Sequence, residues 1–166
     1  MLTVVSSIAV AISMAASLSP IEITLVDEEA VGYATFQSHN RKVVQNARGI
    51  FITHIRTRNE EYTAQTWRLS RSVDGGRTFT TVYEATHATN PPVIESTSSG
   101  DLYLIRPDFE DGNAYLYRFL SERDYVDPVI SEIPGGAAGK FAAALDEARG
   151  TLYYASHNNR VHVLDL

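Results

Sequence analysis

The chain has 166 residues and a formal net charge of −6, with 14 Lys and Arg against 20 Asp and Glu. A mildly acidic chain lacks the concentrated basic surface that grips nucleic-acid phosphates, so we expect no nucleic-acid partner. The absence of cysteine excludes disulfides, thiolate catalysis and Cys-ligated metal sites.

The first 18 residues, MLTVVSSIAVAISMAASL, carry no charged side chain and are mostly apolar or small. Small residues at 13, 15 and 17 suit a signal-peptidase site, and Pro20 then ends any helix. This predicts a helical signal peptide over residues 1–18 and a secreted or periplasmic protein. Because no Lys or Arg precedes the apolar run, a mis-assigned start or a short membrane anchor stays an alternative. We expect residues 21–35 to contribute a strand.

After the leader, apolar runs of strand length recur with a constant spacing. Gly49, Gly100 and Gly150 lie about 50 residues apart, and each stands in a polar turn between two such runs. A period of this length in a strand-rich sequence is typical of propeller blades with four strands each. The sequence therefore predicts an all-β partial β-propeller over residues 21–166, with antiparallel blades at about 37–86, 87–134 and 135–166, the last incomplete.

The strands are expected at 42–45, 50–56, 66–72 and 79–85 in the first blade, at 92–96, 101–106, 114–120 and 128–133 in the second, and at 140–145, 151–156 and 160–164 in the third. No helical periodicity competes with this pattern after the leader, because the apolar runs are short and end at Gly, Pro, Asn or Asp.

A distinctive turn lies between the third and fourth strands of the first blade, with the sequence Ser72-Val73-Asp74-Gly75-Gly76-Arg77-Thr78-Phe79. Its carboxylate at Asp74 is placed to accept backbone N–H groups inside the turn, and Gly75 and Gly76 tolerate positive φ. The hydroxyls of Ser72 and Thr78 are placed to close the hairpin. We expect Phe79 to pack between sheets.

This turn resembles the Asp box, Ser-x-Asp-x-Gly-x-Thr-Trp/Phe, of sialidases and other BNR-repeat propellers. The matching positions are Ser72, Asp74, Gly76, Thr78 and Phe79. The second blade has the degenerate version Ser121-Glu122-Arg123-Asp124-Tyr125 in the same place. The resemblance covers about residues 35–166 and implies a six-bladed ring whose other blades are missing from this chain, through truncation or through assembly with another chain. In that family the Asp box is a folding element away from the active site, which implies a structural role for Asp74.

If the turns between third and fourth strands share one face, the remaining turns and the links between blades share the other. In sialidase-like propellers that other face carries the ligand site. Arg side chains with Asn and His donors suit a carboxylate or a sugar there. We expect Arg56 and Arg106 to occupy similar places at the ends of equivalent strands. The candidate ligand-binding residues are His39, Arg41, His54, Arg56, His87, Asn90, Arg106, Asp108, His157 and Asn158.

These features predict a secreted BNR-repeat propeller that binds an extracellular glycan or protein ligand through the face opposite the Asp box. The alternative is a truncated exo-sialidase-type glycoside hydrolase. The resemblance implies that such an enzyme needs three arginines, a Tyr nucleophile with a Glu partner, and an Asp acid/base. The family's Arg-Ile-Pro sequence is absent and no Tyr/Glu pair can be placed, so enzymatic activity stays open.

Cofactor and metal sites are not expected. The glycine-rich stretch at 135–140 lacks the spacing and the following Ser or Thr of a phosphate-binding loop, so we expect no nucleotide. The acidic turn at 108–113 lacks the register of a known calcium motif, and we interpret it as a solvated turn.

Overall fold

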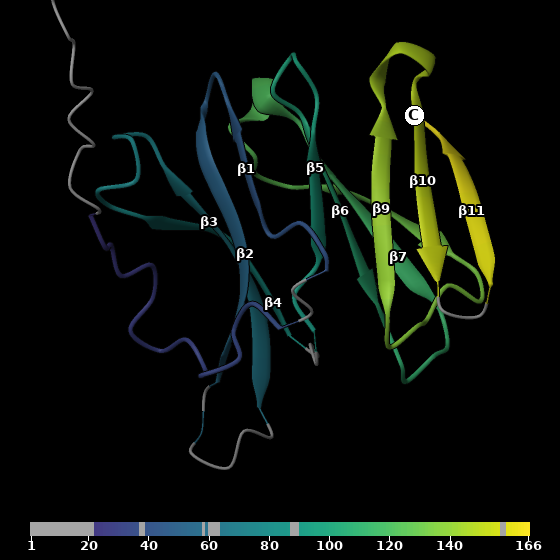
Figure 1. Ribbon diagram of the computed structural model, residues 1–166, viewed down its shortest axis with the longest axis horizontal. Coiled ribbons are helices and arrows are strands. Elements are labelled where there is room, and N and C mark those ends of the chain that lie inside the picture. Colours follow the sequence, from purple (N-terminus) through teal and green to yellow (C-terminus); the bar gives the residue numbers. More distant parts are fainter. Residues whose placement is uncertain (1–21, 37–38, 58, 60–63, 87–89, 157–158) are drawn as a thin grey trace, which may run out of the picture.

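The computed structural model describes residues 22–36, 39–57, 59, 64–86, 90–156 and 159–166 (Figure 1). These residues form three antiparallel β-sheets and no α-helix; the two helical turns, η1 (Ser121–Arg123) and η2 (Glu147–Arg149), are short 3-10 segments. The sheets follow one another in chain order as an open stack (Figure 1). The expected all-β class is confirmed.

Each sheet is a meander in which consecutive strands pair. The strands are β1 Val43–Asn46, β2 Gly49–Thr57, β3 Gln65–Ser72 and β4 Thr80–Thr86 in the first sheet, β5 Val93–Ser96, β6 Leu102–Pro107, β7 Ala114–Phe119 and β8 Val129–Ile133 in the second, and β9 Phe141–Asp146, β10 Thr151–Ser156 and β11 Arg160–Asp165 in the third. The predicted strand positions are confirmed to within one residue at every end, because alternating apolar residues between turn-forming residues specify strands locally.

The sheets contact one another through their first strands, since β5 lies against both β1 and β9 (Figure 1). Side chains alternate along each strand, so every sheet offers one face to each neighbour. Phe51 and Trp67 of the first sheet share a core with Leu104 of the second. Tyr103 belongs to the opposite face of the second sheet and shares a second core with Tyr154 of the third.

Hydrogen bonds between turns also join the sheets. Asn46 donates from Nδ2 to Ser96 Oγ (3.0 Å) and to the Gly100 carbonyl (3.2 Å). Ser98 donates from its backbone N (2.9 Å) and its hydroxyl (2.6 Å) to the Glu147 carboxylate. These bonds join the end of β1 to the turn after β5, and the turn after β5 to the turn after β9. They thereby help to fix how consecutive sheets stack.

Residues 22–36, here called the N-terminal strap, do not form the expected strand. Their only β-contact is an isolated bridge between Ala30 and Arg56. The strap turns back on itself, because the Ala34 N–H bonds to the Val31 carbonyl at 2.9 Å. It still donates from Val31 N to the Ile55 carbonyl (3.3 Å) and accepts from Ile55 N at Ala34 (2.9 Å), beside the part of β2 that β1 does not reach.

The predicted signal peptide at 1–18 lies outside the described residues. None of the described segments forms a helix with the length and hydrophobicity that crossing a membrane requires.

Candidate functional site

The Asp-box turn is held together by its own side chains. Asp74 Oδ1 accepts from Arg77 N and Thr78 N, each at 3.0 Å, and from Ser72 Oγ at 2.8 Å. Asp74 Oδ2 accepts from Thr78 Oγ1 at 2.7 Å. These bonds, those from Thr78 foremost, lower the pKa of Asp74. Gly76 has a φ of 91°, in the region that glycine tolerates.

Phe79 is only partly buried and belongs to neither hydrophobic core, so the expectation that it packs between the sheets is wrong. Tyr125, in the connection between β7 and β8, does pack between the first and second sheets. Its ring is fully buried and meets Phe51 edge-on at 4.6 Å between centroids, and its hydroxyl donates to the Gly100 carbonyl at 2.9 Å. The degenerate box at residues 121–125 therefore places Tyr125 in the core although it lacks the glycines of the first box.

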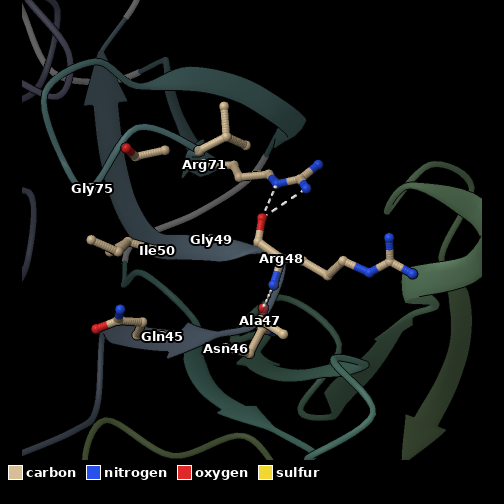
Figure 2. Close-up of a pocket in the computed structure, with 10 residues that line it drawn as sticks. Gln45, Asn46, Ala47, Arg48, Gly49, Ile50, Arg71 and Gly75 are labelled. Atoms are coloured by element: carbon tan, nitrogen blue, oxygen red, sulfur yellow. Dashed lines mark hydrogen bonds between the residues drawn. The ribbon is translucent and has the colours of Figure 1, made fainter.

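A pocket of about 460 Å³ lies at the Asp-box end of the first sheet (Figure 2). Arg71 donates to the Arg48 carbonyl from Nε (2.9 Å) and Nη2 (2.7 Å) and to Asp124 from Nη1 (2.7 Å). Its guanidinium lies over the rings of Phe51 and Tyr125. Arg71 thus joins the first sheet to the second. The pocket is lined by Gln45, Asn46, Ala47, Arg48, Gly49, Ile50, Arg71, Ser72, Val73 and Gly75.

The opposite half of the first sheet carries a row of polar side chains on the face turned away from the second sheet. His54 of β2 lies opposite Arg68 of β3, which lies opposite Glu84 of β4. Arg56 follows two residues after His54 on the same face. Arg68 donates from Nε to Glu84 at 2.6 Å, and Arg56 donates from Nη1 to the same carboxylate oxygen at 3.4 Å.

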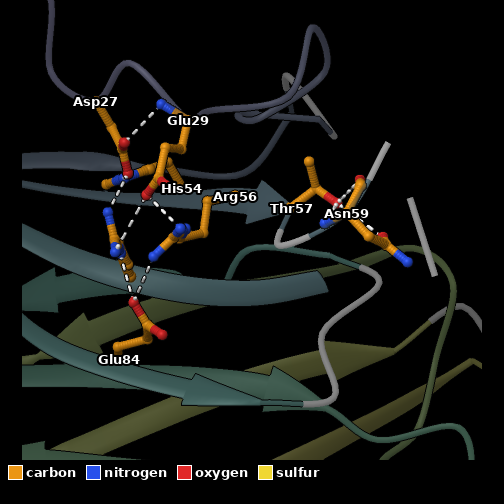
Figure 3. Close-up of polar contacts among 8 residues, drawn as sticks. Asp27, Glu29, His54, Arg56, Thr57, Asn59 and Glu84 are labelled. Atoms are coloured by element: carbon orange, nitrogen blue, oxygen red, sulfur yellow. Dashed lines mark hydrogen bonds and ion pairs between the residues drawn. The ribbon is translucent and has the colours of Figure 1, made fainter. Parts of the chain in front are cut away.

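Two carboxylates of the strap complete this group, which we call the His54 cluster (Figure 3). Asp27 Oδ2 lies 3.0 Å from His54 Nε2 and accepts from Arg68 Nη1 at 2.7 Å. Glu29 forms an ion pair with Arg56. The side chains of His54 and Asp27 are only 3% and 7% exposed. The cluster therefore ties the strap to the first sheet. Its members are Asp27, Glu29, His54, Arg56, Arg68 and Glu84.

Burial and hydrogen bonding shift the pKa values of Asp27 and His54 in opposite directions. Burial raises the pKa of Asp27, but hydrogen bonds from His54, the Glu29 N–H and Arg68 outweigh it and lower that pKa overall. Burial lowers the pKa of His54 more than Asp27 raises it. Nε2 of the imidazole donates to the Asp27 carboxylate, and Nδ1 is buried.

The candidates of the second sheet form a separate group. Arg106 donates from Nη2 to Asp108 at 2.8 Å, and its guanidinium lies over the Tyr115 ring with a side chain only 8% exposed. Tyr115 donates to Asp111. Arg106 shares a face with Leu104 and points toward the first sheet, and Arg56 points away from the second sheet, so both side chains face the same way along the stack. Each stands one residue before the end of its strand, which agrees with the expectation that Arg56 and Arg106 occupy similar places.

Two cationic side chains mark the start of β1. Arg41 donates from Nη1 to Glu95 at 2.6 Å and keeps 57% of its side chain exposed. Lys42 is buried, donates from Nζ to the Pro91 carbonyl at 3.0 Å, and lies over the Phe141 ring. Burial lowers the pKa of Lys42 to about 7. Lys42, at the start of the first sheet, thereby contacts the link to the second sheet through Pro91 and the third sheet through Phe141.

The remaining predicted residues differ in exposure. His39 is exposed and Asn90 is buried, while His87, His157 and Asn158 lie outside the described residues. The structure joins His54 to Arg56 through the His54 cluster and Arg106 to Asp108 directly. Within the described parts of the chain, no group of three or more His, Asp and Glu side chains could hold a metal.

The residues predicted from the sequence do not include the partners that organise these groups, namely Asp27, Lys42, Arg68 and Glu84. Strand alternation does place Arg68 and Glu84 on the face of their strands opposite Trp67. This alternation could have indicated a row of polar side chains on one face of the first sheet. No local pattern shows that Asp27 folds under this face or that Lys42 lies between sheets.

A comparison with protein-family models, with curated proteins and with solved structures found no match.

Proposed function

We propose that this chain is part of a secreted, sialidase-like BNR-repeat β-propeller that binds an extracellular glycan or protein ligand at the end of its sheets opposite the Asp box. The observation that carries this proposal is the Asp-box turn. Asp74 gathers two backbone N–H groups and two hydroxyls between the third and fourth strands of a four-stranded meander. That placement matches the family's motif in both sequence and blade position.

The far face of the third sheet supports a larger assembly. Tyr103 of the second sheet is 4% exposed because the third sheet covers it, whereas Val161 and Val163 of β11 are 62% and 60% exposed. An apolar sheet face left open in this way favours a further sheet packing on it. That sheet would come from a longer product or from another chain of the ring.

The ligand surface on this proposal begins at His39 and Arg41, which are exposed at the start of β1. Glu95 holds the Arg41 guanidinium in place while leaving more than half of the side chain to solvent. A guanidinium presented in this way suits the carboxylate of an acidic sugar or of a protein side chain. His54 and Arg56 instead bind the chain's own carboxylates, so the ligand surface proposed here does not include them.

The alternative, a sialidase-type hydrolase, is favoured by one observation. Tyr115 donates to Asp111 and lies beside Arg106, so a tyrosine stands next to a carboxylate and an arginine. However, the hydrogen bond to Asp111 raises the pKa of Tyr115 to about 12. A phenol with that pKa is a weaker nucleophile at neutral pH than a free tyrosine. The pair therefore does not reproduce an activated Tyr nucleophile.

The test is glycan-array and immobilised-protein binding with the whole chain and with Arg41→Ala. We expect at least tenfold weaker binding for Arg41→Ala and unchanged binding for Arg123→Ala, whose exposed side chain lies in η1 at the Asp-box end. Absence of any binding by the parent chain would contradict the proposal. Turnover of a fluorogenic sialoside that is lost in Tyr115→Phe would establish the hydrolase instead.

A further inference from the structure

The strap carboxylates occupy a site that the first sheet builds without them. Arg56 and Arg68 both donate to Glu84, so β4 holds the two guanidinium groups in place independently of the strap. His54 adds a third donor on the same face, with a side chain 3% exposed. Asp27 binds His54 and Arg68, and Glu29 binds Arg56. The site thus accommodates two carboxylates that stand two residues apart.

The backbone of the strap also forms hydrogen bonds with the backbone of β2. The Ile55 N–H donates to the Ala34 carbonyl at 2.9 Å, the Val31 N–H donates to the Ile55 carbonyl at 3.3 Å, and the Thr57 N–H donates to the Glu29 carbonyl at 3.4 Å. These groups belong to the edge of β2 that extends past β1. Addition of an extended segment to such an edge is a common mode of peptide recognition.

We propose that this edge of β2, together with His54, Arg56 and Arg68, is a recognition site for an acidic peptide, and that residues 22–36 occupy it as an internal ligand. The ligand class is an extended peptide with the spacing Asp-x-Glu. A carbohydrate carboxylate could pair with the arginines but offers no row of N–H and C=O groups for the edge of β2. The partner's peptide therefore competes with the strap for the same donors.

The strap is held weakly enough for an external peptide to displace it. It makes no regular ladder and a single isolated bridge, and the Glu29 side chain is 56% exposed. Val31 is its one buried core residue, and Ala34 packs against the core while partly buried. Segments with few buried contacts and few backbone bonds open at low free-energy cost. The two carboxylates consequently supply much of what keeps the strap in place.

The experiment uses the whole chain and a fluorescein-labelled synthetic peptide with the sequence of residues 22–36, followed by fluorescence anisotropy. The double variant D27N/E29Q weakens the strap, and we expect it to bind the peptide at least tenfold more tightly than the parent chain does. Glu28→Gln is the matched control, because Glu28 is an exposed neighbour outside the His54 cluster. We expect it to bind as the parent does.

A second peptide carrying D27N and E29Q tests the role of charge. We expect it to bind the double variant at least tenfold more weakly than the first peptide, and we expect Arg68→Gln added to the double variant to remove the preference. Equal binding of both peptides, or no binding by a double variant whose circular dichroism matches the parent, would overturn the proposal. If D27N/E29Q does not fold, the single variant E29Q replaces it and must show a gain in the same direction.

This inference is independent of the ligand proposed at Arg41. Arg41→Ala is expected to leave peptide binding unchanged, so loss of glycan or protein binding and loss of peptide binding are separate results.

Discussion

Arg68 of β3 donates to Asp27 of the N-terminal strap across 2.7 Å, between residues 41 apart in the sequence. Both side chains are largely buried, at 16% and 7% exposure. Arg68 also binds Glu84 on the neighbouring strand at 2.6 Å. One guanidinium therefore connects the strap to the polar face of the first sheet.

Removing that guanidinium should destabilise the fold. Arg68→Met leaves Asp27 with His54 alone and Glu84 with the longer contact to Arg56 alone, and removing one partner of a buried ion pair typically costs about 3 kcal/mol or more. We expect the free energy of unfolding, measured by urea denaturation at pH 7, to fall by roughly this amount. Arg123→Met, on an exposed turn, is the control and should match the parent chain. Equal midpoints for both variants would show that the pair contributes nothing.

The buried Lys42 should make the stability of the chain depend on pH. Its pKa is about 7 in the folded chain and 10.5 when exposed, so the unfolded chain binds more protons between these values. Stability of the parent chain therefore rises with pH through this window, and the cost of burying the ammonium is fully present below pH 7. The lowered pKa corresponds to about 5 kcal/mol, so we expect Lys42→Met to be more stable than the parent at pH 6 by this amount less the contribution of the lost contacts with Pro91 and Phe141.

The advantage of Lys42→Met should shrink as pH approaches 10.5, where Lys42 begins to lose its proton in the unfolded chain as well. The measurement is urea unfolding of both chains at several pH values, with the difference between them as the readout. A difference that does not change with pH would contradict the lowered pKa.

Gly49 stands where no other residue fits. Its φ is 141°, and a Cβ at this position would lie 2.2 Å from the Ser72 carbonyl oxygen. Backbone rather than a flexible side chain would have to move, so we expect Gly49→Ala to cost roughly 4 kcal/mol or to prevent folding. Gly32→Ala is the matched control, because nothing lies within 4 Å of a Cβ there. Thermal unfolding followed by circular dichroism distinguishes the two; similar melting temperatures would refute the clash.

Asp74 should act on stability and leave ligand binding alone. Asp74→Ala removes the acceptor for Arg77 N and Thr78 N, so we expect a lower melting temperature at pH 7 than for Glu122→Ala, an exposed control. Because the pKa of Asp74 is lowered from 3.8, its contribution persists above that pH and declines as pH falls below it. An effect on binding at Arg41 without an effect on melting would argue against a structural Asp box.

Local pattern was enough for much of the fold. The strands of all three sheets follow from short alternating runs between Gly, Asn and Asp turns, and the repeat near Gly49, Gly100 and Gly150 predicts their grouping into meanders. The Asp-box bonds join residues within a few positions of Asp74. Interactions of this range depend only on neighbouring side chains and backbone, so the sequence displays them directly.

Contacts between distant segments were decided by the tertiary structure alone. Arg56 and Arg106 stand in similar places at the ends of β2 and β6, yet Arg56 pairs with Glu29 of the distant strap and Arg106 with Asp108 of the adjoining turn. Lys42 becomes a buried amine only where Pro91 and Phe141 meet it. Asp27 becomes an ion-pair partner of Arg68 only because the strap turns beneath the first sheet. The sequence by itself therefore determined the strands and the Asp-box turn, while stacking of the sheets and the path of the strap decided which charges meet.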